Sequence, residues 1–212
     1  PWITYESLCP LHKRQFKDYK NLEYIPVSEK IPKDVGNIIL KLYKPKKYKF
    51  EAPRKFDFDE KFYSIINGIP KHLVDLRLSN AFSMYYSTYE SNKLKCEYET
   101  DISNEYDYVM KIRFDLLFDH PFIFSNYSKN KLTYSNHHWE HPICFTNVWA
   151  LGSSSIMDCY AGTYHTMSEN IENKRIDFTD ECILGRHVHD CGIEKNPITF
   201  NTRILRLKGV SI

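Results

Sequence analysis

The segment YDYVMKIRFDLLFD, residues 106–119, constrains the fold most strongly. It is an apolar, β-prone run that carries charged residues at alternate positions, namely Lys111, Arg113 and Asp115. Its apolar middle predicts a buried strand. In open α/β sheets, ligands bind beyond the carboxyl ends of the strands. The sequence therefore predicts that this strand delivers a basic pair and then a carboxylate to one edge of a sheet.

A carboxylate beside basic groups at a strand end suits a metal ion that holds a diphosphate. Mg²⁺ and Mn²⁺ are hard cations that prefer carboxylate and phosphate oxygens. Asp115 is the candidate metal ligand, and Lys111 and Arg113 would balance the diphosphate charge or hold Asp115 in place. The alternative is a structural ion pair between Arg113 and Asp115 at the strand end.

The charge and hydropathy of the chain exclude several classes of protein. With 29 basic and 27 acidic residues, the net charge of +2 is too balanced for a nucleic-acid partner. No apolar run approaches the roughly 20 residues of a membrane span, and no secretory signal precedes Pro1. We therefore expect a soluble, cytoplasmic protein. Its six cysteines form no CxxC pair, so we expect them to be reduced and mostly buried.

The first half of the chain shows mixed helical and extended patterns. Helices are expected at 4–16, 34–45 and 80–99, and strands at 22–27, 46–53 and 106–113. Pro45 should stop the second helix, and Ser79 or Asn80 should cap the third. Residues 54–75 are expected to be loop with some helix.

The second half of the chain repeats the alternation of strand and helix. Extended structure should continue through 115–124, and strands are expected at 131–136 and 203–212. Residues 145–167 should form a strand, a turn and a helix that starts at 153–155. A further helix over 177–192 should begin at a Thr179 cap and end at Gly192. Overall, the pattern predicts an α/β fold with a mixed, mostly parallel central sheet flanked by helices, in a single domain over 1–212.

Four segments, in this order, resemble a group of glycosyltransferases found in bacterial polysaccharide clusters and in large DNA viruses. The segments are LYKPKKYKFEAPRKFD (42–57), FSMYYSTYESNKLKCEYE with YDYVMKIRFDLLFD (82–119), WALGSSSIMDCY (149–160) and DFTDECILGRHV (177–188). In that group, a helix with an SM-YS pattern precedes a strand that ends in R-x-[RK]-x-D or R-x-D.

The resemblance implies a GT-A-like fold, a nucleoside-diphosphate sugar as donor, Mn²⁺ or Mg²⁺, and a glycan or glycoprotein acceptor. It implies a host-cytoplasmic location if the source is a virus. Asp115 matches the motif's aspartate, and Glu181 and His187 match positions of the last segment. Only one aspartate is present where a D-x-D would supply two ligands, and His187 is the candidate for the second. The alternative is that His187 is an ordinary core or surface histidine.

The family's opening strand, which ends in G-x-x-R, is not visible near the N-terminus. Either the chain is trimmed or gapped there, or this member is built differently.

Sugar transfer with inversion requires a general base within reach of the acceptor hydroxyl. Glu181 and Asp180 are the candidates, because they begin a helix whose N–H groups should keep a carboxylate ionised. The alternative is that they are ordinary first-turn acids, which helices favour.

Several polar residues are candidates for binding the donor. Arg77, Asn80 and Ser83 would reach its base or ribose, although helix capping explains Asn80 equally well. Asn147 and Trp149 would line the sugar or acceptor pocket, with Trp149 stacking on a sugar ring. A tryptophan in a strand is more often a core residue.

Two other functions remain open. His137, His138 and His141 could form a zinc hydrolase site with a histidine of 177–192, although no H-E-x-x-H motif is present. A non-catalytic glycan-binding domain would keep an aromatic pocket and lose metal dependence. The P-loop and Rossmann fingerprints are absent, which speaks against kinases and dehydrogenases.

Overall fold

The computed structural model describes residues 34–65, 71–113, 116–136, 143–173, 179–199, 202–206 and 210–211. The chain divides into two compact units, residues 1–45 and 46–212. In the first unit, helix α2 (Val35–Tyr43) ends at Lys44, whose left-handed backbone donates its N–H to the Leu40 carbonyl. The helix expected at 34–45 is confirmed. The helix expected at 4–16 and the strand expected at 22–27 lie outside the described residues.

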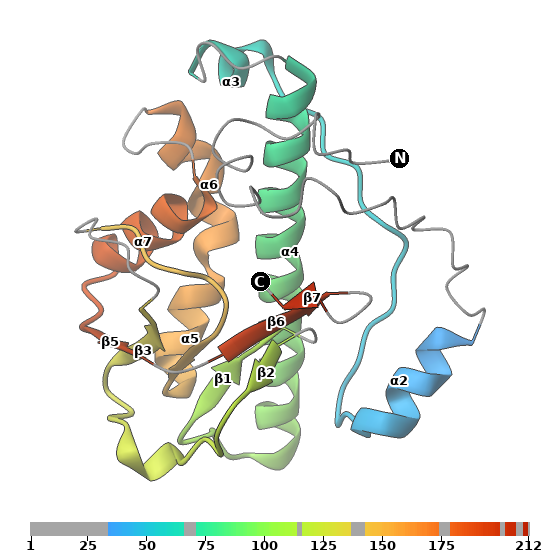
Figure 1. Ribbon diagram of the computed structural model, residues 1–212, viewed down its shortest axis with the longest axis vertical. Coiled ribbons are helices and arrows are strands. Elements are labelled where there is room, and N and C mark those ends of the chain that lie inside the picture. Colours follow the sequence, from blue (N-terminus) through green and yellow to red (C-terminus); the bar gives the residue numbers. More distant parts are fainter. Residues whose placement is uncertain are drawn as a thin grey trace. The chain divides into compact units, whose positions relative to one another are not determined.

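Helix α4 (Lys71–Ile102) is the longest element of the second unit, with 32 residues (Figure 1). Side chains at helical spacing along its first half are buried and pack toward α5 (Ser154–Ala161) and α6 (Thr163–Glu172). They include Val74, Leu78, Ala81, Phe82 and Tyr85.

The helix begins well before the cap expected at Ser79 or Asn80, so both residues are interior to it and that expectation is wrong. Burial of Val74 and Leu78 favours continuing the helix across the apparent cap signal.

The main sheet has four strands in the order β1 (Val109–Lys111), β4 (Ala150–Gly152), β3 (Leu132–Ser135) and β5 (Lys195–Ile198). The β1–β4 and β4–β3 pairs are antiparallel, and only the β3–β5 pair is parallel. The α/β class is confirmed, but a mostly parallel sheet is wrong. The alternation of helices with strands suggested parallel crossovers, yet among the described strands of this sheet only β5 is parallel to its neighbour, β3.

A second, antiparallel sheet contains β2 (Leu116–Phe118), β6 (Thr202–Arg206) and β7 (Val210–Ser211). The single strand expected over 203–212 is therefore two strands. Extended structure after residue 115 lasts only through β2, and a 3₁₀ turn, η3 (Phe124–Asn126), follows.

No strand forms at 46–53. Lys49 instead forms ion pairs with Glu51 and with Glu90 of α4, so this segment is anchored to a helix and not to a sheet. Within residues 54–75, the structure has the short helix α3 (Glu60–Ile65) and the start of α4.

Three helices, α5, α6 and α7 (Asp180–Asp190), lie on the same side of α4 (Figure 1). The Ser153 side chain accepts a hydrogen bond from the Ile156 N–H, and the Thr179 side chain accepts one from the Cys182 N–H. Gly192, with φ +68°, follows the end of α7. The helix starts expected near 153–155 and at Thr179 and the stop at Gly192 are confirmed.

Four cysteines form two disulfides, Cys144–Cys182 and Cys159–Cys191, so the expectation of reduced cysteines is wrong for them. The partners lie on separate elements, 38 and 32 residues apart, and no local sequence spacing predicts the pairing. Cys96 is a free thiol.

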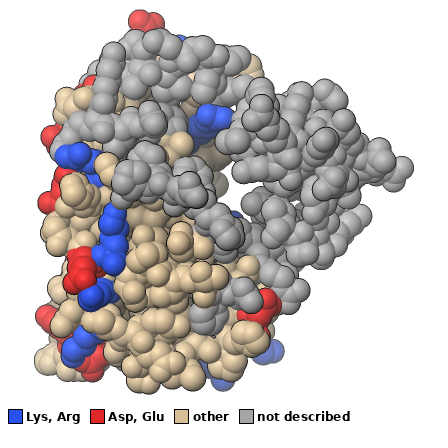
Figure 2. Space-filling view, turned by 60° about the vertical axis from the view of Figure 1, so that its left-hand side comes forward, with Lys and Arg blue, Asp and Glu red and all other residues tan. Residues whose placement is uncertain are grey.

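The described part of the chain has no helix long and apolar enough to cross a membrane. On the face shown in Figure 2, basic and acidic side chains lie next to one another along one edge, and much of the remaining coloured surface is uncharged. Ion pairs among the described residues include Arg186–Asp190 and Lys131–Glu194.

Candidate functional site

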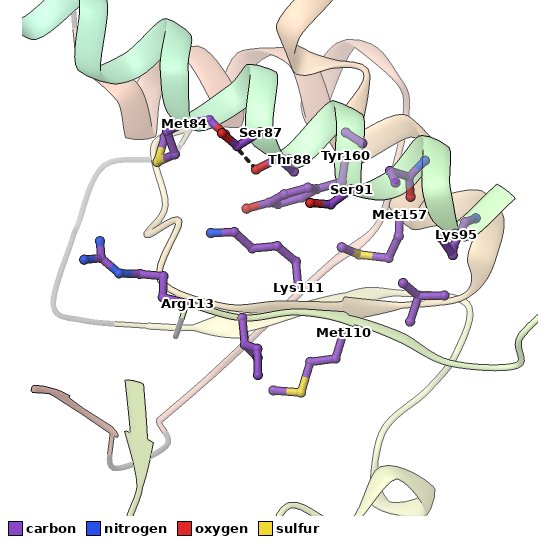
Figure 3. Close-up of a pocket in the computed structure, with 14 residues that line it drawn as sticks. Met84, Ser87, Thr88, Ser91, Lys95, Met110, Lys111, Arg113, Met157 and Tyr160 are labelled. Atoms are coloured by element: carbon purple, nitrogen blue, oxygen red, sulfur yellow. Dashed lines mark hydrogen bonds between the residues drawn. The ribbon is translucent and has the colours of Figure 1, made fainter. Parts of the chain in front are cut away.

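A cavity of about 510 Å³ lies between α4, β1 and α5 (Figure 3). Its wall along α4 runs from Met84 to Lys95, and its opposite wall includes Val109–Arg113 of β1 and the residues that follow it. Small-molecule sites commonly have volumes of about 300–1,000 Å³ and mostly apolar walls with a few polar groups. The size and position of the cavity therefore make it the candidate ligand site.

Lys111 and Arg113, two of the residues singled out in the sequence, line this cavity. The Lys111 side chain extends from β1 toward α4 and Tyr160, whereas Met110 lies on the other side of the strand (Figure 3). This is the alternation that a strand imposes. The Lys111 ammonium donates to the backbone carbonyl of Asn147, which holds it at the cavity wall.

Asn147 connects Lys111 to the start of α7. Its side-chain amide donates to the Asp180 carboxylate at 2.6 Å, and the Tyr85 hydroxyl of α4 donates to the Asp180 backbone carbonyl at 2.6 Å. Asn147 is 7% exposed and Tyr85 is 1% exposed, so these contacts are shielded from water. Lys111, Asn147 and Asp180 come from three separate parts of the sequence, and the structure joins them in one chain of hydrogen bonds.

Glu181 adjoins this hydrogen-bonded chain. Its burial, together with a hydrogen bond and a like charge from Asp180, raises the pKa of Glu181 to about 8. This direction is opposite to the expectation that the helix N-terminus keeps Glu181 ionised. The helix N-terminus favours charge there, but burial and the neighbouring acid outweigh it.

Two buried tyrosines complete the surroundings of Asp180. Burial is the main cause that raises the pKa of both Tyr85 and Tyr160 above the usual tyrosine value, and the Asp180 charge adds to it. The Tyr160 hydroxyl has no hydrogen-bond partner within the described residues. Tyr160 also lines the cavity. Sequence reasoning missed both tyrosines, because a tyrosine in an apolar helical stripe has the same pattern as a core residue.

The other candidates for donor binding lie elsewhere. Trp149 is fully buried against Phe118 and Phe122, with ring centroids 6.3 and 5.4 Å away. It is a core residue and offers no face to a sugar, so its expected role is wrong in this structure.

Arg77, Asn80 and Ser83 do not line the cavity. They continue along α4 on the N-terminal side of the cavity wall. Asn80 and Ser83 are exposed, and Arg77 is half-buried. Ser83 lies one turn before the cavity residue Ser87, whose hydroxyl donates to the Ser83 carbonyl at 2.8 Å. A ligand longer than the cavity could follow this helix face outward.

His187 lies about 10 Å along α7 from the acidic pair, since seven residues separate it from Asp180. Its ring nitrogens contact the Thr166 hydroxyl at 2.9 Å and the Cys159 carbonyl at 2.7 Å. Burial lowers the pKa of His187. The structure thus places His187 in a separate cluster beside the Cys159–Cys191 disulfide.

The expected metal ligand Asp115 and the cluster of His137, His138 and His141 lie outside the described residues. No carboxylate lines the cavity among the residues that the structure describes. In the same described set, the one group of three or more His, Cys, Asp or Glu side chains close enough to share a metal ion is Cys159, His187 and Cys191. The roles of Asp115 and the three histidines stay predictions.

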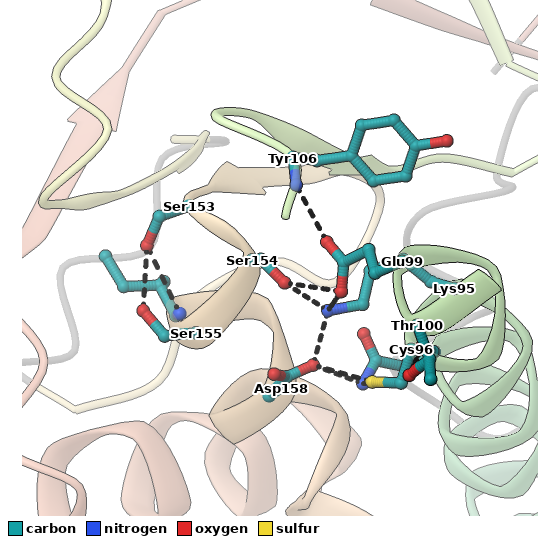
Figure 4. Close-up of polar contacts among 11 residues, drawn as sticks. Lys95, Cys96, Glu99, Thr100, Tyr106, Ser153, Ser154, Ser155 and Asp158 are labelled. Carbon is teal, nitrogen blue, oxygen red and sulfur yellow. Dashed lines mark hydrogen bonds and ion pairs between the residues drawn. The ribbon is translucent and has the colours of Figure 1, made fainter. Parts of the chain in front are cut away.

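A second polar cluster braces α4 against α5 (Figure 4). The Lys95 ammonium contacts the Ser154 hydroxyl at 2.5 Å, Asp158 at 2.6 Å and Glu99 at 3.1 Å. Burial disfavours charge on these groups, but their mutual contacts outweigh it, raising the pKa of Lys95 and lowering the pKa of Glu99 and of Asp158. These fully paired charges are suited to a structural role.

No protein-family model matches the chain, and no curated protein or solved structure matches it either. The resemblance to glycosyltransferases therefore stays a prediction, supported by the sequence segments quoted above.

Proposed function

We propose that the protein is a glycosyltransferase that moves a sugar from a nucleoside-diphosphate sugar to a glycan or glycoprotein acceptor. One observation carries the proposal. Lys111, a candidate to neutralise the diphosphate, is linked through Asn147 to Asp180, next to the candidate base Glu181. This chain of hydrogen bonds, which connects the candidate diphosphate-binding lysine to the candidate acids, lies beside a cavity of suitable size and so supports the proposal.

In the proposed complex, the diphosphate lies along the end of β1. Lys111 and Arg113 bring two positive side chains to the cavity wall, where they would offset the charge of the leaving nucleoside diphosphate. The base and ribose would extend along α4 past Ser87 toward Ser83 and Asn80, which lie on the same helix face.

A divalent cation on the diphosphate would be held by Asp115, two residues after Arg113. No carboxylate lines the described part of the cavity, so Asp115 is the candidate carboxylate ligand for Mn²⁺ or Mg²⁺. The Cys159, His187 and Cys191 group does not fit that role, since sulfur ligands suit softer metals than Mn²⁺ or Mg²⁺. Bound there, the cation would supply additional charge stabilisation to the leaving group.

Glu181 would act as the general base that accepts the proton of the acceptor hydroxyl. A pKa of about 8 makes its carboxylate a stronger base than an ordinary glutamate, while a useful fraction remains deprotonated at neutral pH. Asp180 is the neighbouring candidate, and Asn147 and Tyr85 hold it in position. The proposed transfer rate should rise with pH and level off above about 8.

The test is a thermal-shift screen of nucleoside diphosphates and nucleotide sugars, with and without Mn²⁺. A ligand that binds the folded state raises the melting temperature by mass action. We expect one nucleoside diphosphate to raise it in the presence of Mn²⁺, and Lys111→Gln and Asp115→Asn to abolish the shift. Lys129→Gln is the matched control, because Lys129 pairs with Asp107 on the surface and does not line the cavity.

Three results would contradict the proposal in different ways. A nucleotide shift that Lys111→Gln leaves intact would place the donor elsewhere. Binding of a nucleotide sugar without transfer to any supplied acceptor would indicate a glycan- or nucleotide-binding domain. A shift with Zn²⁺ alone, lost when His137, His138 and His141 are replaced, would favour the zinc hydrolase.

A further inference from the structure

The C-terminal end of α7 and the middle of α5 bring together three groups that the proposed sugar transfer does not use. His187 and Cys191 are four residues apart, which places them on one face of α7 and its C-terminal cap. Cys159 of α5 faces them. The sulfur atoms of both cysteines and a ring nitrogen of His187 all lie within 4.8 Å of one another.

We propose that reduction of the Cys159–Cys191 disulfide converts this cluster into a Zn²⁺ site. The ligands are the thiolates of Cys159 and Cys191 and Nε2 of His187, and a water molecule occupies the fourth position. Two thiolates and an imidazole form a donor set that zinc prefers.

The distances already match a tetrahedral site at two of its edges. Zn–S bonds of about 2.3 Å and Zn–N bonds of about 2.0 Å place sulfur and nitrogen ligands about 3.6 Å apart. His187 Nε2 lies 3.6 Å from the Cys191 sulfur and 3.8 Å from the Cys159 sulfur. Two changes are then required. The sulfur–sulfur edge lengthens to about 3.8 Å when the disulfide opens, and His187 Nε2 gives up its 2.7 Å contact with the Cys159 backbone carbonyl.

A second interaction orients the histidine for this role. Thr166 Oγ1 lies 2.9 Å from His187 Nδ1 and can donate its own hydrogen to the Thr163 carbonyl at 3.3 Å. Before zinc binds, the Cys159 carbonyl accepts the imidazole proton from Nε2. When zinc binds, that proton resides on Nδ1 and is accepted by Thr166, which leaves the Nε2 lone pair for the metal. Such an outer partner is typical of zinc-bound histidines.

The site is accessible from one side. Cys191 is exposed and Cys159 half-buried, whereas His187 is 9% exposed. A reductant can therefore reach this disulfide more easily than Cys144–Cys182, both of whose cysteines are 4% exposed. A dithiol reduces the bond by exchange, giving two cysteine thiols and the oxidised, cyclic form of the dithiol. Zinc then replaces one proton on each thiol, so two protons are released.

The experiment uses the full chain, reduced briefly with a dithiol under native conditions and desalted under nitrogen. Thiol alkylation and peptide mapping identify the sample in which Cys159 and Cys191 are free and Cys144–Cys182 is intact. Cobalt(II) is then titrated as a coloured substitute for zinc. We expect thiolate-to-cobalt charge transfer in the near ultraviolet, intense visible bands of tetrahedral cobalt, and loss of both on adding Zn²⁺.

Matched variants separate this site from any other. Cys191→Ser and His187→Asn should weaken cobalt binding by at least about 100-fold, and Thr166→Val by about 10-fold. Cys96→Ser and His189→Asn, which alter a thiol and an imidazole outside the cluster, should leave the spectrum unchanged. The oxidised chain should show no charge-transfer band.

The absence of a charge-transfer band in the selectively reduced chain would overturn the proposal. The same conclusion would follow if the band persisted in Cys191→Ser, or if cobalt bound without thiolate charge transfer. None of these outcomes bears on nucleotide binding at the cavity, so the zinc site and the proposed sugar transfer are tested independently of each other.

Discussion

At the scale of single residues, Glu181 shows how burial reverses a local preference. A first-turn acid on a helix normally has its charge stabilised by the helix N–H groups. Here burial and the adjacent Asp180 raise the pKa of Glu181 well above the ordinary value of 4.5. The folded protein therefore binds a proton at this position that the unfolded chain releases at lower pH.

Glu181→Gln should change the pH dependence of stability. A raised pKa means that the group's favourable contribution is complete below about 4.5 and is lost as the pH rises through about 8. Glutamine cannot ionise and avoids this loss. We expect wild type and variant to be similar near pH 5, and the variant to be more stable by about 1–3 kcal/mol above pH 8, as measured by urea unfolding.

Glu99→Gln should change the pH dependence of stability in the opposite direction to Glu181→Gln. Its contacts lower the pKa of Glu99, so its contribution is present above about pH 4.5 and is lost as the pH falls below that value. A pH-independent difference between wild type and Glu181→Gln would show that Glu181 is ionised in the folded protein.

At the scale of elements, helix α7 packs closely on the segment that leads into β4. A Cβ atom added to Gly185 would lie 2.1 Å from the carbonyl oxygen of Ile143. One turn away, the Cys144–Cys182 disulfide ties the same two elements together. The glycine therefore permits a backbone contact that any side chain would prevent.

Gly185→Ala should destabilise the protein by about 1–3 kcal/mol through overpacking, although alanine is normally the better helix former by about 1 kcal/mol. Urea unfolding measures the change. Gly192→Ala is the control, because its added Cβ meets no neighbour and only the left-handed backbone opposes it. If Gly185→Ala were as stable as wild type, residues 143–144 would have to move away from the added methyl group.

The contact between α4 and α5 depends on Lys95 (Figure 4). Lys95→Met should leave Glu99 buried without its cation and cost about 1–3 kcal/mol in urea unfolding. The double variant Lys95→Met, Glu99→Gln should recover part of this loss, since no buried carboxylate is then left without its cation and only the more exposed Asp158 loses its ion-pair partner. Lys129→Met removes an exposed ion pair and should have no measurable effect. Equal losses in the single and double variants would contradict this explanation.

At the scale of the second unit, residues 46–212, two interleaved disulfides hold the C-terminal half together. Cys144–Cys182 and Cys159–Cys191 enclose overlapping loops, because Cys159 lies inside the first loop and Cys191 outside it. Once one bond has formed, the other closes a shorter effective loop of the unfolded chain. The two bonds therefore remove partly the same conformational entropy from the unfolded chain.

Replacing either cysteine pair with serine should lower the free energy of unfolding by about 3–4 kcal/mol, as expected for loops of 38 and 32 residues. Removing both should cost less than the sum of the two losses. Chemical unfolding of the three variants measures this, and peptide mapping without reductant verifies the pairing. A loss equal to or greater than the sum would contradict the shared-loop explanation.

The sequence by itself determined the local interactions of the chain. The Thr179 and Ser153 caps depend on a side chain and a backbone N–H three residues later, and the stop at Gly192 depends on a single backbone angle. The strand β3 and the helix α2 follow from short apolar patterns in the same way. These features need no knowledge of distant residues.

Interactions between distant residues were decided by the tertiary structure alone. The antiparallel pairing of β1 with β4, the two disulfides and the link from Lys111 through Asn147 to Asp180 all join residues more than 30 positions apart. The raised pKa of Glu181 and the burial of Trp149 are of the same kind, because they depend on what surrounds each side chain. A chemical type and a spacing can nominate such residues, but only packing decides which of them are exposed, charged and within reach of one another.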